Sequence, residues 1–181
     1  MKQKELSRSV LIFGGAGFIG SNLAECLLRN TEAKVHIFDN LSRQGVRHNL
    51  ISLEKLAGRS RRLQVTIADI RDAEAVGRAV QTATEIYHFA AQVAVTTSVL
   101  DPRLDFETNL MGTFNILEAV RKSGTRPFLL FTSTNKIYGS ASSGEIWPER
   151  TRYGCSNPAG TPETQPLDFH SPYGCSKGAA D

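Results

Sequence analysis

A glycine-rich turn near the start of the chain constrains the fold more than any other feature of the sequence. The segment GGAGFIG at residues 14–20 follows the apolar run VLIF at 10–13 and leads into a segment with helical periodicity. It fits the spacings G-x-G-x-x-G and G-x-x-G-x-x-G. Glycines at such positions allow a tight turn and let backbone N–H groups approach a pyrophosphate at the positive end of a helix. The segment therefore predicts the first strand–turn–helix unit of a dinucleotide-binding sheet.

Strand-like and helix-like segments alternate as far as residue 131. Short apolar runs lie at 10–13, 35–38, 63–68, 85–90 and 128–131. Between them, apolar residues recur three or four positions apart, as on one face of a helix. The first such face holds Ile19, Leu23, Cys26 and Leu27, which predicts a core position for Cys26. The longest helix is expected over 102–122, from a proline to just before Gly124. Repeated strand–helix units predict an α/β, Rossmann-type fold with a parallel sheet and helices on both faces.

Acidic residues follow two of the predicted strands. Asp39 comes about 20 residues after the last glycine of the turn, where a carboxylate can accept hydrogen bonds from both hydroxyls of an adenosine ribose. Because a carboxylate there repels a 2′-phosphate, the sequence favours NAD over NADP, and Arg43 is near enough to soften that preference. Asp69 follows the strand at 63–68 and, taken alone, is most simply a turn residue.

One tyrosine has the neighbour that a catalytic base needs. The tyrosines are Tyr87, Tyr138, Tyr153 and Tyr173. Only Tyr173 has a lysine four residues later, Lys177, and that spacing places both side chains on one face of a helix. A nearby ammonium lowers the pKa of a phenol from its usual value near 10, which gives a base that works near neutral pH. The sequence therefore predicts a Tyr/Lys pair after a nucleotide-binding sheet.

Composition excludes several other classes of protein. The chain has 181 residues, 40% hydrophobic, and a formal net charge of +3, which is too small to argue for nucleic acid. The basic cluster at 59–62 is interpreted as a solvated loop. No apolar run approaches the ~20 residues of a membrane helix, and the polar start lacks a signal peptide's apolar core. Three cysteines without a CxxC, and four histidines without a shared ligand spacing, indicate neither a disulfide framework nor a metal site. A cytoplasmic location is expected.

These motifs together resemble the extended short-chain dehydrogenase/reductase superfamily, the nucleotide-sugar epimerase and dehydratase group. The resemblance rests on GGAGFIG, Asp39-Asn40, Asp69-Ile70, HFAA at 88–91, NLMGTFNILEA at 109–119, STNKIYG at 133–139 and Tyr173–Lys177. It covers nearly all of residues 9–181 in the family's order. Longer runs, such as DNLSRQGVRHNL at 39–50 and LDFHSPYGCSKGAAD at 167–181, are similar to the CDP-tyvelose (CDP-paratose) 2-epimerases.

The resemblance implies an enzyme that oxidises a sugar carbinol transiently and then reduces it again, with NAD as a bound cofactor. Tyr173 would take the proton from a sugar hydroxyl, Lys177 would activate Tyr173 and bind the nicotinamide ribose, and Thr134 would hydrogen-bond the reacting oxygen. The implied cofactor-binding residues are Gly14, Gly17, Phe18, Ile19, Gly20, Asp39, Asn40, Asp69, Ile70, Ala90, Ala91, Gln92, Asn109, Tyr173 and Lys177. The implied partners are a nucleotide sugar, with a CDP-sugar favoured, and a second copy of the full-length protein.

The chain stops at Asp181, four residues after Lys177. Family members continue with the rest of that helix, further strands and most of the sugar pocket. We therefore expect the strand at 128–131 to be an open edge, and the chain alone to bind NAD weakly without turning over a sugar. A binding module without catalysis stays an alternative, as do a UDP-glucose 4-epimerase and a dTDP-sugar 4,6-dehydratase. A dehydratase is expected to carry an acidic pair after Thr134, whereas Asn135 and Lys136 follow here.

The predicted organisation has four parts. Residues 1–8 form a polar tail, 9–138 the NAD-binding domain, and 139–171 a surface loop beside the active site. Residues 172–181 begin the truncated Tyr/Lys helix. The loop is assigned on its content of Pro, Ser and Gly, and it holds the only tryptophan, Trp147.

Overall fold

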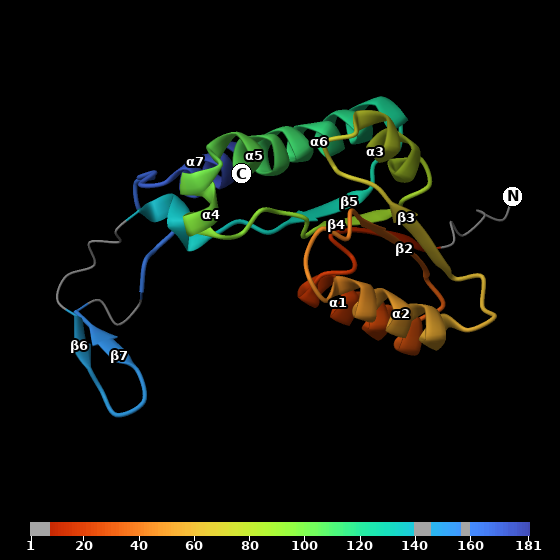
Figure 1. The fold of residues 1–181 in the computed structure, drawn as a ribbon, viewed down its shortest axis with the longest axis horizontal. Helices are drawn as coiled ribbons and strands as arrows, with labels where there is room; N and C mark the ends of the chain where they lie inside the picture. The colour runs from red at the N-terminus through yellow and green to blue at the C-terminus, as the bar shows by residue number, and fades with distance from the viewer. Residues whose placement is uncertain (1–7, 140–145, 157–159) are drawn as a thin grey trace, which may run out of the picture.

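The computed structural model describes residues 8–139, 146–156 and 160–181. Within them, five strands form one parallel sheet in the order β3-β2-β1-β4-β5 (Figure 1). The strands are β1 Ser9–Phe13, β2 Lys34–Asp39, β3 Leu63–Ile67, β4 Glu85–His88 and β5 Phe128–Phe131. This arrangement confirms the α/β, Rossmann-type prediction. The predicted tail at 1–8, apart from Arg8, lies outside the described residues.

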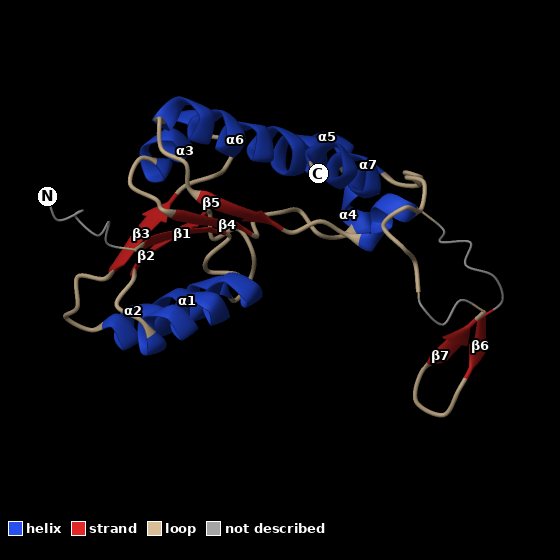
Figure 2. Cartoon of the chain, turned by 180° about the vertical axis from the view of Figure 1, so that it is seen from behind, coloured by secondary structure: helices blue, strands red, loops and turns tan. Residues whose placement is uncertain are grey.

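Helices cover both faces of the sheet (Figures 1 and 2). On one face lie α1 Phe18–Asn30 and α2 Val46–Ala57; on the other lie α3 Ala73–Val80 and α6 Gly112–Ser123. Each layer has its own apolar core. Val10, Ile12 and Ile37 pack with α1 and α2, while Leu11, Phe13 and Ile86 pack with α3 and α6. Alternate residues of β1 thus face opposite cores, as expected for a strand buried on both faces.

Helix α1 presents a different face to the sheet from the one that the sequence pattern predicts. Its buried residues are Gly20, Ala24, Leu27 and Leu28. The prediction that Cys26 lies in the core is wrong, because its side chain is exposed, and Ile19 is 57% exposed. The cause lies at Gly20, which packs against the carbonyl oxygen of Gly14. That contact fixes the rotation of the helix, so Ile19 points away from the core.

The predicted long helix at 102–122 is interrupted by a wider turn. It consists of α5 Pro102–Phe106, a π-helical segment η1 Glu107–Met111, and α6. Gly124 follows it with a left-handed φ of 69°. Between β4 and α5, the chain forms the short helix α4 Val95–Leu100. Single π-turns inside α-helices occur often at functional sites, and this one carries the buried Asn109.

The segment predicted as a loop at 139–171 contains a small hairpin. β6 Ile146–Pro148 pairs antiparallel with β7 Tyr153–Cys155, and Figure 1 shows the pair away from the main sheet. The indole of Trp147 lies over Gly154, where a Cβ would come within 2.5 Å of its Nε1 atom. Glycine at that position therefore makes room for the tryptophan. Residues 140–145 and 157–159 of the predicted loop lie outside the described residues.

A short 3-10 turn, η2 Asn135–Tyr138, follows β5. The last helix is α7 Pro172–Ala180. Ser171 caps α7 by accepting a hydrogen bond from the Gly174 N–H. Among the described residues, β5 has only β4 as a neighbour in the sheet, so its other edge is open. None of the described helices is both long and apolar enough to span a membrane.

Candidate functional site

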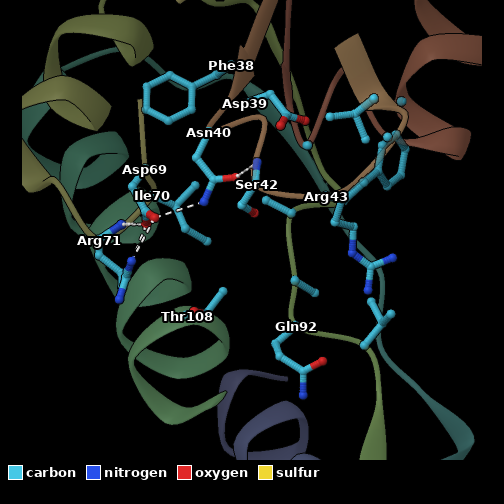
Figure 3. A pocket seen from close by; sticks show the side chains of 18 of the residues that line it. Phe38, Asp39, Asn40, Ser42, Arg43, Asp69, Ile70, Arg71, Gln92 and Thr108 are labelled. Carbon is cyan, nitrogen blue, oxygen red and sulfur yellow. Dashed lines mark hydrogen bonds and ion pairs between the residues drawn. The ribbon is translucent and has the colours of Figure 1, made fainter. Parts of the chain in front are cut away.

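A groove of about 630 Å³ lies at the carboxyl ends of the strands. The chain enters the sheet at β1, adds β2 and β3 on one side and returns to add β4 and β5 on the other. Connections after β1 and β4 therefore leave toward opposite faces, which opens a crevice between them. The groove is lined by residues of the glycine turn, by 38–40, 42 and 43 at the end of β2, by 68–71 after β3, and by 89–94 after β4 (Figure 3).

The glycine turn forms one end of the groove with bare backbone. Gly14 has a φ of 75°, a left-handed conformation that favours glycine, and a Cβ there would lie 2.6 Å from the Ala90 nitrogen. Its N–H donates to the Phe38 carbonyl oxygen at 2.8 Å. Gly17 begins helix α1 without a side-chain cap, and the first turn carries no acidic residue. The helix N-terminus therefore offers unpaired N–H groups and positive potential to an anion.

Two large apolar side chains flank this turn. Phe18 is 83% and Ile19 57% exposed, although both are bulky and hydrophobic. They line the groove together with the glycines. Exposed apolar side chains at the rim of a groove are typical of a ligand-binding site.

Asp39 lies at the end of β2 and lines the groove next to the glycine turn. Its carboxylate accepts hydrogen bonds from the N–H of Ala16 at 3.0 Å and of Leu41 at 2.8 Å, one on each oxygen. The second of these bonds holds Leu41, the only non-glycine residue with a positive φ (55°) among the described residues. Each oxygen keeps a further lone pair, so Asp39 can still accept two ligand hydroxyls.

Asp69 and Asn40 form the neighbouring wall. Asn40 donates to Asp69 at 2.9 Å, and Arg71 binds the same carboxylate with two side-chain N–H groups (Figure 3). The hydrogen bonds from Arg71, with that from Asn40, lower the pKa of Asp69 to about 2. Ile70 is buried beside it, 5% exposed. Asp69 is thus more than a simple turn residue, because it joins the ends of β2 and β3.

The residues after β4 form the far end. Ala90, Ala91 and Gln92 line the groove. Asn109 does not line it, but holds Gln92 by both backbone groups: its Oδ1 accepts from the Gln92 N–H at 2.9 Å and its Nδ2 donates to the Gln92 carbonyl at 3.0 Å. Twelve of the fifteen expected cofactor residues therefore line the groove, and the remaining three are Asn109, Tyr173 and Lys177.

The Tyr/Lys pair lies on α7, buried beside this far end. Tyr173 is 8% and Lys177 3% exposed. Among the described residues, the Tyr173 hydroxyl has no hydrogen-bond partner. Lys177 donates to the Thr132 carbonyl oxygen at 2.5 Å and lies 4.0 Å from the centre of the Phe131 ring. Burial lowers the pKa of Lys177 to about 8, against the opposing effect of the Asp181 and Asp105 carboxylates.

Thr134 reaches the same region from the end of β5. Its hydroxyl accepts from the Lys136 N–H at 3.3 Å and caps η2. A Cβ at Gly174 would lie 2.7 Å from the Lys136 carbonyl oxygen, so α7 packs tightly on the turn after Thr134. The structure thereby brings the segments of Thr134, Tyr173 and Lys177 together.

Sequence reasoning missed part of the site. The groove is also lined by Ser42, Arg71, Leu104 and Thr108, and by Arg43, which was noted only for its charge. The fully buried Asp105 and Ser176 were not recognised either. A signal for Asp105 was its position four residues before Asn109, on the same face of the helix. Within the described residues, no three His, Cys, Asp or Glu side chains gather as a metal site would require.

Epimerases and dehydratases are among the known proteins that match this chain. A family described as GDP-mannose 4,6 dehydratase matches residues 11–181. A CDP-paratose 2-epimerase of Salmonella typhi is 44% identical over 175 residues, which cover 95% of this chain and 50% of the relative. The chain spans about half the length of the curated relatives it matches.

Two solved structures show the same fold. The UDP-glucose 4-epimerase of Thermus thermophilus, in complex with NAD, matches with a TM-score of 0.68 at 40% identity over 95% of this chain and 48% of that one. DesIV, a dTDP-glucose 4,6-dehydratase from Streptomyces venezuelae with NAD and TYD bound, matches with a TM-score of 0.74 at 32% identity over 95% of this chain and 49% of that one.

Proposed function

The chain belongs to the GDP-mannose 4,6-dehydratase family, and on that premise we propose that its groove binds NAD for transient oxidation of a nucleotide sugar. The observation that carries the proposal is the groove itself. It joins a glycine turn at a helix N-terminus to a strand-end carboxylate and leads to a buried Tyr/Lys pair. Two structural relatives were solved with NAD.

The residues present fit a dinucleotide. The pyrophosphate would lie on the N–H groups at the start of α1. Glycines at 14 and 20 allow the tight turn there, because a Cβ at either position would collide with backbone. Asp39 and Asn40 would hold the adenosine ribose, and Asp69 and Ile70 would lie beside the adenine. The negative charge of Asp39 disfavours a 2′-phosphate, which supports NAD rather than NADP.

The protein's own groups would control the proton. NAD bound in the groove would supply a hydride acceptor and donor. Tyr173 would accept the proton of the sugar hydroxyl when the carbinol is oxidised to a keto sugar, and would return that proton when the keto group is reduced again. Lys177, held by the Thr132 carbonyl, would place a positive charge one helical turn from Tyr173. Thr134 would orient the reacting oxygen.

We propose the chemistry of a CDP-sugar epimerase. The support is the relative at 44% identity, a CDP-paratose 2-epimerase. The dehydratase and UDP-glucose 4-epimerase relatives that match at 35% identity share the same half, so a UDP- or dTDP-sugar is the competing substrate. We further propose that the full-length protein assembles with a second copy, and that the present chain holds NAD without appreciable turnover.

Calorimetry with NAD⁺ and NADP⁺ tests the cofactor proposal. Saturable NAD⁺ binding, with NADP⁺ at least about tenfold weaker, supports it; absence of both interactions contradicts it. A mixture of the chain, NAD⁺ and CDP-paratose, followed by NMR, tests catalysis. CDP-tyvelose formed at a rate abolished by Tyr173→Phe would contradict the proposal that this chain does not turn over a sugar.

A further inference from the structure

A fully buried carboxylate lies outside the groove, at the point where its far end meets α7. Asp105, on α5, is 0% exposed and makes no ion pair among the described residues. An unpaired carboxylate is costly to bury unless several donors satisfy it. Three side chains do so here. They are Gln92 through Nε2 at 2.8 Å, Asn109 through Nδ2 at 3.4 Å, and the hydroxyl of Ser176 at short range.

Each donor belongs to a different part of the site. Gln92 lies in the loop that lines the groove, and Figure 3 shows its side chain at the end of the groove away from Asp39. Asn109 lies in the π-turn. Ser176 lies on α7, between Tyr173 and Lys177, and is also fully buried. Asp105 therefore binds the loop, the π-turn and the helix at once.

The arrangement suits a group that only accepts hydrogen bonds. Oδ1 of Asp105 accepts from Gln92 and Asn109, and Oδ2 accepts from Ser176. An amide would turn an N–H₂ group toward at least one of these donors, since it has a single acceptor oxygen. The amide of Asn109 donates as well to the Ser176 hydroxyl at 3.0 Å. That hydroxyl has the Asp105 carboxylate as its nearer acceptor and the Tyr173 carbonyl, at 3.2 Å, as its second.

On the basis of the proposed function, we propose that Asp105 is a positioning residue, which holds the helix of Tyr173 and Lys177 in register with the groove loop at 90–94. It contacts neither the groove nor the Tyr/Lys side chains by hydrogen bonds. It acts through Gln92 on one side and Ser176 on the other. Its carboxylate also raises the pKa of Lys177, together with that of Asp181, against the lowering effect of burial.

Three variants of the present chain test this. Asp105→Asn disrupts the acceptor, and Ser176→Ala removes only the link to α7. Asp101→Asn is the matched control, because Asp101 caps the same helix through the Leu104 N–H and asparagine caps equally well. Hydrogen–deuterium exchange of peptides covering 172–180 reports how firmly α7 is held, and the ¹³Cε shift of Lys177 as a function of pH reports its pKa.

We expect about tenfold faster exchange of α7 in Asp105→Asn and in Ser176→Ala, with the control unchanged. The midpoint of the Lys177 titration should fall by about half a pH unit or more in Asp105→Asn only, because Ser176→Ala keeps the charge. A general loss of packing would shift the Lys177 midpoint alike in Asp105→Asn and Ser176→Ala, so a shift in one variant alone points to the charge. The NAD⁺ dissociation constant should rise about fivefold in Asp105→Asn, since Gln92 loses its partner.

The proposal is overturned if exchange of α7 in Ser176→Ala and the Lys177 midpoint in Asp105→Asn both match the control. If Asp105→Asn does not fold, the exchange measured in Ser176→Ala decides alone. A native chain that binds no NAD⁺ would remove the proposed function of the groove. The exchange and the titration would still decide on Asp105, so the two failures are distinguishable.

Discussion

The carboxylate of Asp39 accepts a hydrogen bond from the backbone N–H of Ala16 at 3.0 Å, across 23 residues of sequence. The end of β2 and the glycine turn are therefore one structural unit. A change at Asp39 should alter the shape of the turn as well as the contact with a ribose.

Asp39→Asn should weaken NAD⁺ binding about tenfold or more and reduce the preference over NADP⁺, because one charged acceptor is lost. Calorimetry with both nucleotides measures this. Asp72→Asn is the control, since Asp72 caps α3 away from the groove by accepting from Glu74 and Ala75. An unchanged ratio of the two affinities in Asp39→Asn would count against the assigned ribose contact.

Gly20→Ala should destabilise the protein by about 2 kcal/mol or more and abolish NAD⁺ binding. The new Cβ would collide with the Gly14 carbonyl and lie 2.7 Å from the Gly15 Cα, and backbone cannot move aside cheaply. Gly77→Ala is the matched control, since nothing lies within 4 Å of its Cβ position. Because Gly77 is inside α3, alanine there should stabilise by roughly 0.5–1 kcal/mol. Urea midpoints of the two variants that shift in the same direction would refute this.

Tyr173→Phe should leave the melting temperature and the NAD⁺ affinity nearly unchanged, since the hydroxyl has no hydrogen-bond partner among the described residues. In a full-length protein it should abolish formation of the reduced nicotinamide from a sugar substrate. Tyr153→Phe, at an exposed position on β7, serves as the control for removal of a phenol. Turnover retained in Tyr173→Phe would exclude Tyr173 as the base.

Acid should destabilise the fold through His88. Burial lowers the pKa of His88 from 6.5 to about 3, with a further lowering by Lys177. Below pH 6.5 the unfolded chain binds a proton there that the folded chain refuses until about pH 3, so this contribution to stability is lost as the pH falls. Between about pH 7 and pH 4.5 the loss should be about 2 kcal/mol.

The comparison of His88 with His88→Gln isolates that contribution, because all other groups titrate in both proteins. Urea unfolding at about pH 7 and pH 4.5 gives the two differences. Equal pH dependence in the two proteins would show that His88 takes up its proton in the folded state as readily as in the unfolded one.

The sheet, its helices and most of the groove follow from local sequence patterns. The glycines follow an apolar run at fixed spacing, and Asp39 follows the next apolar run. Such patterns lie within short stretches of sequence, so they can be recognised without the fold. The exposure of Cys26 could not be predicted that way, because the rotation of α1 is set by the contact of Gly20 with Gly14 in the folded turn.

Contacts between distant segments account for the other differences. The π-turn is invisible to a pattern of apolar residues, because Asn109 is placed by Gln92 and Ser176 rather than by its neighbours. The Trp147 hairpin depends on the fit of an indole over Gly154. Asp105 is a charged residue near the start of a helix, and only the fold shows that it is buried.

The open edge of β5 should also affect how a chain of these 181 residues behaves in solution. Its outward row of backbone N–H and C=O groups is a template on which another strand can be laid, and Phe128 beside it is 56% exposed. Copies of the chain at high concentration should therefore stack strand to strand. Protein concentration, more than heating, is then expected to set the onset of precipitation.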